Sequence, residues 1–394
     1  MDSLLNYLWI AAQLVIGFNL IFPFILFCLY LLKFKKTSEP TLTCTDLDYA
    51  VIITAYQYVN SLPDAVASAL KLNYTNYMVY VVADNCDVSS LKFDDDRVVL
   101  LRPETILQGN VKSHFYAIDR FVRNHDVITI IDSDNLVDRE YLNELNKFFN
   151  KGFKAVQGVR EAKNLDTVYS CLDAARDIYY HFYDGKLLFG AGSSATLSGS
   201  GMAFTTQLYK ECLENRNISG AGFDKVLQFL ILAKNLRIAF APGAIVFDEK
   251  TSLPQQLVNQ RSRWINTWFK YFVLGFKIIG MGIRNFSLNQ LLFGLVLLRP
   301  PLFLFLLISG IMLLVNLAIN MLAAGLWVVS LALFVFSFII SLRVSNADAR
   351  IFVSLKGVPR FIFYQLISLT KIFSANKRSV ATRHYHTNSD FNRK

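Results

Sequence analysis

The sequence predicts an α/β domain with a mainly parallel sheet, attached to membrane-spanning helices near both ends of the chain. Three observations support this prediction. Residues 4–32 and 301–342 contain no charged side chain. Short apolar runs alternate with helical patterns between residues 46 and 250, and such alternation is typical of a parallel sheet covered on both faces. Hydrophobic residues make up 53% of the 394 residues, which is more than an ordinary soluble enzyme contains.

Charge and cysteine content narrow the function classes. The net charge is +10, and many of the Lys and Arg residues lie beside the apolar segments. This pattern is typical of the cytoplasmic side of a membrane protein and not of a nucleic-acid-binding face, so we expect no nucleic-acid partner. The cysteines lie far apart, which argues against a zinc site or a disulfide framework and suits a reducing compartment. They are Cys28, Cys44, Cys86, Cys171 and Cys212.

The first apolar segment predicts a membrane anchor over residues 1–36. Leu4–Leu32 is long enough to cross a bilayer, and lysines follow it at once. A cleaved signal peptide has a basic start and a shorter apolar core. We therefore expect an uncleaved helix with the N-terminus outside and the lysines inside. Residues 37–45 read as a polar linker.

Residues 46–250 predict a cytoplasmic domain. The expected strands are Tyr49–Thr54, Tyr77–Ala83, Arg97–Leu101, Val127–Ile131 and Lys154–Gly158. The expected helices are Pro63–Leu72, Val111–Arg123 and Arg139–Asn150. Ligands of parallel sheets bind beyond the carboxyl ends of the strands, and polar residues follow three of the expected strands. A site is therefore expected along that edge, and the Gly- and Ser-rich segment 185–202 is expected to be a mobile loop beside it.

The main candidate site is Asp132-Ser133-Asp134, directly after an apolar strand. Residues i and i+2 of an extended chain project to the same side, so both carboxylates can reach one point. Such oxygen ligands suit Mg²⁺ or Mn²⁺ shared with the phosphates of a substrate. A solvated turn is an equally common reading of the pair, so the pair alone does not establish a metal site.

Four further positions are candidates. Tyr56 closes the first strand end, and Asp84 closes the second, where a carboxylate can accept an imide N–H from uracil. Lys112 lies at a helix start and offers a point charge to a diphosphate. Taken alone, these residues are more commonly turn, cap or solvated side chains. Asp224 precedes an apolar helix, where it is either a helix cap or a general base for an acceptor hydroxyl.

Residues 251–299 predict amphipathic interface helices. Within the expected helix Leu253–Phe276, Gln260, Arg263 and Trp264 lie on one stripe because they are three and four positions apart. Basic and aromatic residues on such a stripe are also ordinary anchors at a bilayer surface.

Residues 300–343 predict two further membrane spans. These are Pro301–Ile319 and Leu326–Leu342, joined by a tight connection over Asn320–Gly325. For residues 344–394 we expect an interfacial helix over Ile351–Phe373 and a basic cytoplasmic tail. The whole pattern predicts three spans, a cytoplasmic domain and a cytoplasmic C-terminus.

In order along the chain, these motifs resemble the membrane-embedded family 2 glycosyltransferases, which include cellulose, hyaluronan and poly-N-acetylglucosamine synthases and ceramide glucosyltransferase. The resemblance covers roughly residues 49–268 and implies a nucleotide-diphospho-sugar transferase domain of the GT-A type that rests on interface helices. The motifs are Ile53-Thr54-Ala55-Tyr56, Val82-Ala83-Asp84-Asn85, the Lys112 segment, Asp132-Ser133-Asp134, Gly222-Phe223-Asp224-Lys225 and Gln260-Arg261-Ser262-Arg263-Trp264.

The resemblance also implies roles. It assigns the nucleotide-sugar to Tyr56, Asp84, Lys112 and Asp132, the metal to Asp134 with Asp132 nearby, catalysis to Asp224, and the acceptor and diphosphate end to Gln260, Arg263 and Trp264. The sequence departs from the family pattern at Thr54 and at Gln57-Tyr58, which loosens the inference of uridine over guanosine. Phe223 stands before the catalytic aspartate, where the family usually has a polar residue.

The implied function is inverting, metal-dependent transfer, with Mg²⁺ or Mn²⁺, from a UDP-sugar to a growing β-linked polysaccharide at the plasma (inner) membrane. The alternative acceptor is a membrane lipid, such as a polyprenyl phosphate, diacylglycerol or a ceramide-like lipid. Three spans form a thin wall for a polymer channel, which favours a lipid acceptor, an oligomer or an export partner. A non-catalytic binding module is a remote alternative, because it has no need of Asp224 and the stripe behind it.

Overall fold

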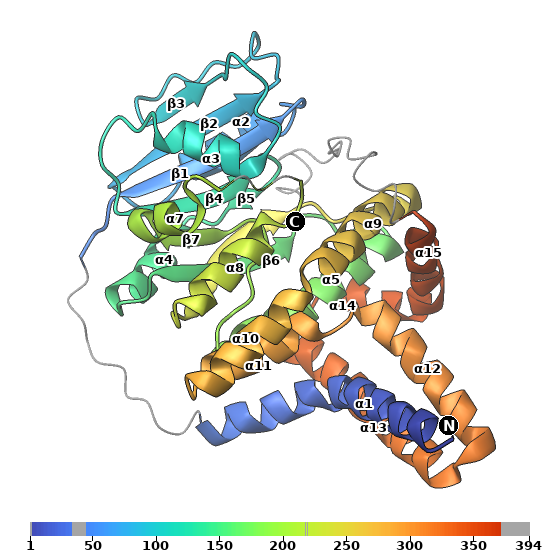
Figure 1. The fold of residues 1–394 in the computed structure, drawn as a ribbon. Coiled ribbons are helices and arrows are strands. Elements are labelled where there is room, and N and C mark those ends of the chain that lie inside the picture. The colour runs from blue at the N-terminus through green and yellow to red at the C-terminus, as the bar shows by residue number, and fades with distance from the viewer. Residues whose placement is uncertain (1, 34–44, 217, 219, 372–394) are drawn as a thin grey trace.

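The computed structural model describes residues 2–33, 45–216, 218 and 220–371 and contains one central sheet (Figure 1). The sheet has eight strands in the order β3-β2-β1-β4-β7-β6-β8-β5. They are β1 Tyr49–Tyr56, β2 Tyr77–Asp84, β3 Val98–Leu101, β4 Val127–Asp132, β5 Leu136–Val137, β6 Ala155–Ala162, β7 Met202–Thr205 and β8 Ile238–Asp248.

The predicted mainly parallel sheet is confirmed. Strands β1 to β4 run parallel, as do β6 and β8. The short strand β7 is antiparallel to both β4 and β6 and so joins the two parallel groups, while β5 is antiparallel to β8. The register pairs Thr54 with Asp132, and Tyr56 with Asp84. The polar ends of β1, β2 and β4 therefore lie side by side at one edge.

Helices cover both faces of the sheet. The helices α2 (Leu62–Ala69) and α4 (Tyr141–Asn150) pack on the face that carries Val51 and Ile53. The opposite face is covered by α3, α7 and α8, whose bounds are Asn110–Ile118, Thr206–Leu213 and Phe223–Ala233. Burial on both faces explains why the strands read as continuous apolar runs.

The segment expected to be a mobile loop is instead packed into the domain. It follows α5 (Val168–Tyr180) and comprises the end of the π-helix His181–Leu187, the short helix α6 (Leu188–Gly190) and a buried stretch before β7. Small residues fit here because space is short: a Cβ at Gly185 would lie 2.5 Å from the Phe240 ring. Residues 191–201 do form a loop, as predicted, but glycine and serine mark close packing in it and many of its residues are buried.

The predicted interface helix is two helices. α9 (Pro254–Tyr271) ends before Phe272, and α10 (Val273–Arg284) follows it and packs against α11 (Leu288–Leu298). Glycine allows this contact, since a Cβ at Gly294 would lie 2.5 Å from Ile279. In Figure 1, α10 and α11 lie between the sheet and α1.

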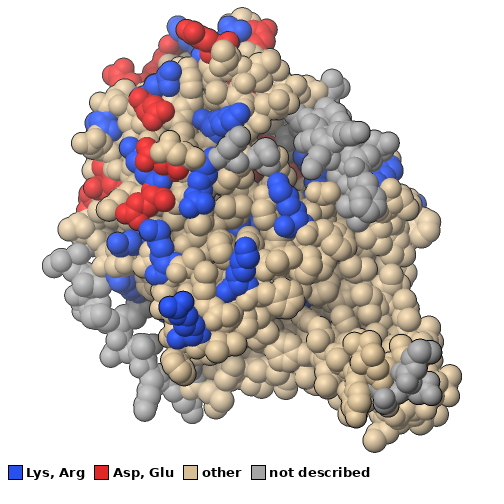
Figure 2. All heavy atoms as spheres, viewed as in Figure 1, with Lys and Arg blue, Asp and Glu red and all other residues tan. Residues whose placement is uncertain are grey.

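Three helices are long and apolar enough to cross a membrane: α1 (Asp2–Lys33), α12 (Leu302–Ile319) and α13 (Met321–Val344). They pack together away from the sheet (Figure 1). The connection between α12 and α13 is shorter than predicted and consists of Asn320 alone, whose side chain caps α13 by accepting the Ala323 N–H at 3.1 Å. Figure 2 shows charged side chains over the sheet domain and hardly any over the part that contains these three helices.

A polar contact joins the three apolar helices. The Gln13 side-chain oxygen on α1 accepts the Asn316 amide of α12 at 2.7 Å and the Trp327 indole N–H of α13 at 2.9 Å. Polar groups in an apolar setting are costly unless they are paired. The contact therefore fixes how the N-terminal helix sits against the C-terminal pair.

The predicted interfacial helix is also broken. It consists of α14 (Ala349–Ser354), a 3₁₀ turn and α15 (Val358–Thr370), and no part of it is long enough to be a candidate span. α15 packs against α9, where the Ser262 hydroxyl donates to the Ser368 carbonyl at 3.1 Å. Residues 34–44, which include Lys35, Lys36 and all of the predicted linker except Thr45, and residues 372–394, which include the basic tail, lie outside the described residues.

Candidate active site

A cavity of about 1250 Å³ opens at the polar edge of the sheet. It is walled by the ends of β1, β2 and β4, by α5, α8 and α9, and by the first turn of α12. The predicted site residues that line it are Tyr56, Asp84, Asp132, Asp134, Asp224, Gln260, Arg263 and Trp264. Lys112 does not line it and is exposed on α3, although its neighbours Gly109 and Ser113 do.

The Asp84 carboxylate organises the loop before α3. One of its oxygens accepts the Leu107 N–H and the other accepts the Gln108 N–H, both at 2.9 Å. The residue is only 2% exposed. Each carboxylate oxygen has a second lone pair, so Asp84 can hold the loop and still accept a hydrogen bond from a ligand.

Asp132, the last residue of β4, and Asp134, in the loop that follows, reach the same cavity. The Asp132 N–H donates to the Ser200 hydroxyl at 3.1 Å, and Asn135 donates to the same hydroxyl at 2.7 Å. Asp134 is buried, with 7% exposed. Among the described residues, no group of three or more His, Cys, Asp or Glu side chains is placed to hold a metal. Two carboxylates fit an ion whose remaining oxygen ligands come from substrate phosphates and water.

Asp224 enters the cavity because a glycine precedes α8. Gly222 occupies the cap position with φ +98°, a conformation that favours glycine. A Cβ there would lie 2.6 Å from Thr267 and 2.7 Å from Tyr271, both on α9. Asp224 is therefore not the helix cap. Its carboxylate lies 3.3 Å from the Lys225 ammonium and is partly exposed.

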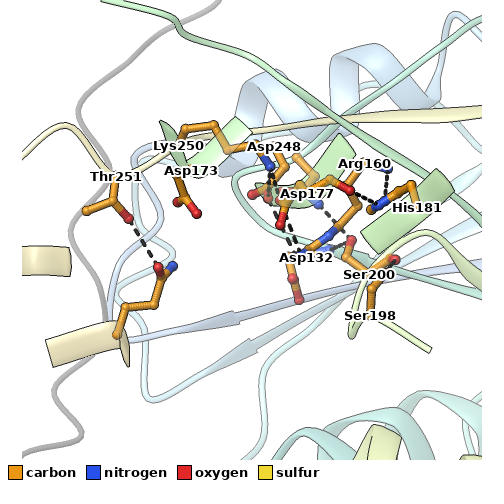
Figure 3. A network of polar contacts seen from close by, with 12 residues as sticks. Asp132, Arg160, Asp173, Asp177, His181, Ser198, Ser200, Asp248, Lys250 and Thr251 are labelled. Carbon is orange, nitrogen blue, oxygen red and sulfur yellow. Dashed lines mark hydrogen bonds and ion pairs between the residues drawn. The ribbon is translucent and has the colours of Figure 1, made fainter. Parts of the chain in front are cut away.

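The α9 stripe forms the wall opposite the strand ends. Gln260 accepts the Thr251 hydroxyl at 3.3 Å, an interaction drawn in Figure 3. The Trp264 ring is partly exposed and has the guanidinium carbons of Arg176 and Arg261 each 4.2 Å from its centroid. Such cation–π contacts hold the indole ring in place.

A buried charge network, which the sequence did not reveal, forms the floor of the cavity (Figure 3). Asp173 and Asp177 lie one turn apart on α5. Asp177 contacts Arg176, Lys250 at 2.6 Å and Arg160 at 3.6 Å, while Asp173 pairs with Arg261 and with Arg176. Burial opposes ionisation of Asp177, yet the surrounding cations hold its pKa well below the usual range. The sequence did contain one signal for this network, since Asp173 and Asp177 are four positions apart and so lie on the same face of a helix.

Two further residues of this network, Asp248 and His181, were not among the predicted site residues. Asp248, at the end of β8, lines the cavity and pairs with Lys250 at 2.9 Å. His181 accepts the Arg160 N–H at Nε2, 2.9 Å, and its Nδ1 lies 2.9 Å from the Asp177 carbonyl. Burial lowers the pKa of His181 to about 4, so the ring is neutral at physiological pH.

The cavity extends to the start of a candidate membrane span. Arg299, between α11 and α12, forms a buried ion pair with Asp184 of the π-helix. Its guanidinium carbon lies 5.5 Å from the Tyr180 ring centroid. Pro300 to Phe303 also line the cavity. One cavity thus joins the strand ends to the first turn of α12.

Comparison with known proteins identifies the family. Residues 47–267, more than half of the chain, match the family model described as glycosyltransferase like family 2. No curated protein sequence matches the chain. A solved mannosyltransferase, PcManGT from Pyrobaculum calidifontis in complex with GDP-Man and Mn²⁺, is similar over 92% of this chain and 97% of its own, with a TM-score of 0.52 and 12% identity. Similarity at that identity concerns the fold. The chain belongs to glycosyltransferase family 2, and it is a glycosyltransferase of the GT-A type with helices apolar enough to span a membrane on both sides of the domain.

Proposed function

We propose that the protein moves a sugar from a nucleoside-diphosphate donor to an acceptor at the membrane surface, with inversion at the anomeric carbon. One observation supports this most: Asp134, Asp224 and the α9 stripe come from three separate elements and line a single cavity. The donor proposed from the sequence is a UDP-sugar. The similar solved enzyme holds GDP-Man, and Thr54 departs from the family pattern, so a test has to include both nucleotides.

In the proposed reaction, Asp224 accepts the proton of the acceptor hydroxyl. The acceptor oxygen forms a bond to the anomeric carbon while the bond from that carbon to the diphosphate breaks, and the electron pair leaves with the diphosphate. Arg263 lies on the cavity wall to meet that charge. A placed base contributes about 10²–10⁴-fold to the rate. No covalent intermediate with the enzyme is needed.

We further propose that Asp134, with Asp132 nearby, holds Mg²⁺ or Mn²⁺ on the donor diphosphate. Both side chains line the cavity and offer only oxygen ligands, which these ions prefer. The ion, when bound, neutralises charge on the departing diphosphate. The similar solved enzyme was obtained with Mn²⁺.

For the membrane arrangement, we propose three spans in the plasma (inner) membrane, with the sheet domain and C-terminus cytoplasmic and the N-terminus outside. Two observations support it: α12 and α13 form a tight hairpin, and the charged side chains nearest to the charge-free part in Figure 2 are Lys and Arg. A cysteine introduced at Met321 should react with a membrane-impermeant thiol reagent in intact cells. Labelling only after lysis contradicts this orientation.

For the acceptor, a growing β-linked saccharide is the first candidate and a membrane lipid the second. One observation favours the second: the described residues that line the cavity include none from α1 or α13, so a single copy offers no route for a polymer between its spans. A polysaccharide product would therefore need an oligomer or a separate export partner.

The deciding experiment incubates the full-length protein in lipid nanodiscs with radiolabelled UDP- and GDP-sugars and separates polymer from lipid extract. The expected result is label in one of these fractions with one of the donors. The matched control is the Asp224→Asn variant, in which label should disappear from both fractions. Equal labelling by the wild type and this variant refutes the proposal.

A further inference from the structure

A buried ion pair in the cavity wall bears on the choice of acceptor. Asp184 and Arg299 are 3% and 7% exposed, and each lines the cavity. The pair joins the π-helix to the residue just before Pro300-Pro301 and α12. π-helical turns occur often at functional sites. The position lies between the donor end of the cavity and the membrane helix.

Each partner of this pair has one polar atom to spare. Among the described residues, no hydrogen-bond partner is found for Asp184 Oδ1 or for Arg299 Nη1. Buried polar atoms are nearly always paired, and leaving one unpaired is costly. Both side chains line the cavity and keep about 5% of their surface exposed.

The pair is also close to the proposed base along a short path. The Asp184 carbonyl accepts the Thr196 N–H at 3.0 Å, and the carbonyl of the next residue, Leu197, accepts from the Lys225 ammonium at 3.4 Å. Lys225 in turn lies 3.3 Å from Asp224. The two sides of the cavity are therefore tied together through two consecutive residues.

The spare atoms select a type of ligand. One is an acceptor and the other a donor, and a hydroxyl group, which both donates and accepts, satisfies the two at once. A phosphate satisfies Arg299 only and is repelled by the Asp184 carboxylate. An apolar lipid tail satisfies neither. A diacylglycerol or a polyprenyl phosphate has no second hydroxyl beside its reacting oxygen, so the chemistry matches an acceptor with several hydroxyls, such as a sugar.

We propose that Asp184 and Arg299 bind a hydroxyl of the acceptor's terminal sugar, so that the acceptor is a saccharide or a glycolipid and not a bare lipid phosphate. This inference rests on the proposed function. The pair binds one hydroxyl of the acceptor sugar and so orients a neighbouring hydroxyl of the same sugar towards Asp224.

The first test compares acceptors with the full-length wild-type protein in nanodiscs. The probes are a polyprenyl phosphate, the same lipid carrying a diphosphate-linked saccharide, and a short β-linked oligosaccharide. Transfer to a sugar-bearing probe but not to the bare phosphate is expected. Efficient transfer to the bare phosphate, or transfer to none of these probes, overturns this inference, whereas the proposed function is overturned only by equal labelling by the wild type and the Asp224→Asn variant.

The second test removes the charges without leaving one unpaired. The double variant Asp184→Asn/Arg299→Gln keeps polar groups of similar size, and its matched control is Asp348→Asn/Arg350→Gln, at an exposed ion pair outside the cavity. We expect the KM for the sugar-bearing acceptor to rise about tenfold to a hundredfold, while the donor KM stays constant. An unchanged acceptor KM in a folded variant, or equal rises for donor and acceptor, overturns the inference.

Discussion

The Lys250 ammonium lies 2.6 Å from the Asp177 carboxylate, and both side chains are almost completely buried. Asp248 approaches the same ammonium at 2.9 Å. This contact ties α5 to the segment that leads from β8 into α9. The buried lysine therefore helps to set where the α9 stripe stands relative to the sheet.

Replacing this lysine by an apolar residue should destabilise the fold. In Lys250→Met, Asp248 loses its closest cation and Asp177 keeps only Arg176 and Arg160, and breaking a buried ion pair costs about 3–5 kcal/mol. Thermal unfolding in detergent should show a clearly lowered Tm. Lys147→Met is the matched control, because Lys147 pairs with Glu144 at the surface, where ion pairs contribute little. Similar Tm values for both variants contradict the prediction.

The Asp224→Asn variant should separate binding from chemistry. Asparagine keeps the size of the side chain but does not accept the proton, so kcat should fall by about 10²–10⁴-fold. Donor affinity, measured by calorimetry, should change little. Loss of donor binding together with turnover would assign Asp224 to the nucleotide site instead.

The Asp134→Ala variant should behave in the opposite way. Without that carboxylate the divalent ion loses a ligand, so Mn²⁺-dependent donor binding should weaken at least tenfold, as it should in wild type with excess chelator. Asp119→Ala, an exposed site on the far end of α3, serves as the control. Full activity in chelator would exclude the metal role.

Stability should rise with pH between about 4 and 6.5. His181 has a pKa lowered to about 4 by burial, whereas its unfolded value is near 6.5, so between these values the unfolded chain binds a proton that the folded chain does not. Stability is complete above pH 6.5 and falls as the pH drops towards 4, by about 3 kcal/mol from this one group. Unfolding of His181→Gln should show a smaller slope over this range. An identical slope contradicts the assignment.

The Gly222→Ala variant should lose activity through geometry. Its φ of +98° and the short distance to Tyr271 leave no place for a methyl group. We expect α8 to move away from α9, with a large loss of kcat and a modest loss of stability. Gly152→Ala has a similarly positive φ but open space around it, so it reports the cost of backbone strain alone.

Much of the fold was predictable from local patterns. The apolar runs that form β1, β2 and β4 end in polar residues. The same pattern therefore locates each strand and the functional side chains at its end. The short antiparallel strand Met202–Thr205 was missed, since four residues carry no period. The break at Phe272 also escaped, because no local signal there outweighs the apolar pattern, whereas the break at the 3₁₀ turn coincides with Gly357 and Pro359.

Site residues that belong to a single sequence motif were predicted, whereas residues that act together from distant segments were missed. Asp132, Asp134 and Asp224 each follow a recognisable strand or glycine, and all reach the cavity. Lys112 was assigned to the nucleotide site from its position in the order of motifs, but the way its side chain faces on α3 depends on how that helix packs. The network around Asp177 joins segments more than 70 residues apart, so only the tertiary structure shows that its charges neutralise one another.

The contact of Gln13 with Asn316 has a consequence for how the protein is made. The two residues are 303 positions apart, and synthesis proceeds at about 5–20 residues per second, so α1 waits about 15 to 60 s for its partner to leave the ribosome. Throughout that interval its amide faces lipid or another protein. We therefore expect biogenesis to require an insertion factor that shelters this one polar group. A Gln13→Leu chain should not need that factor.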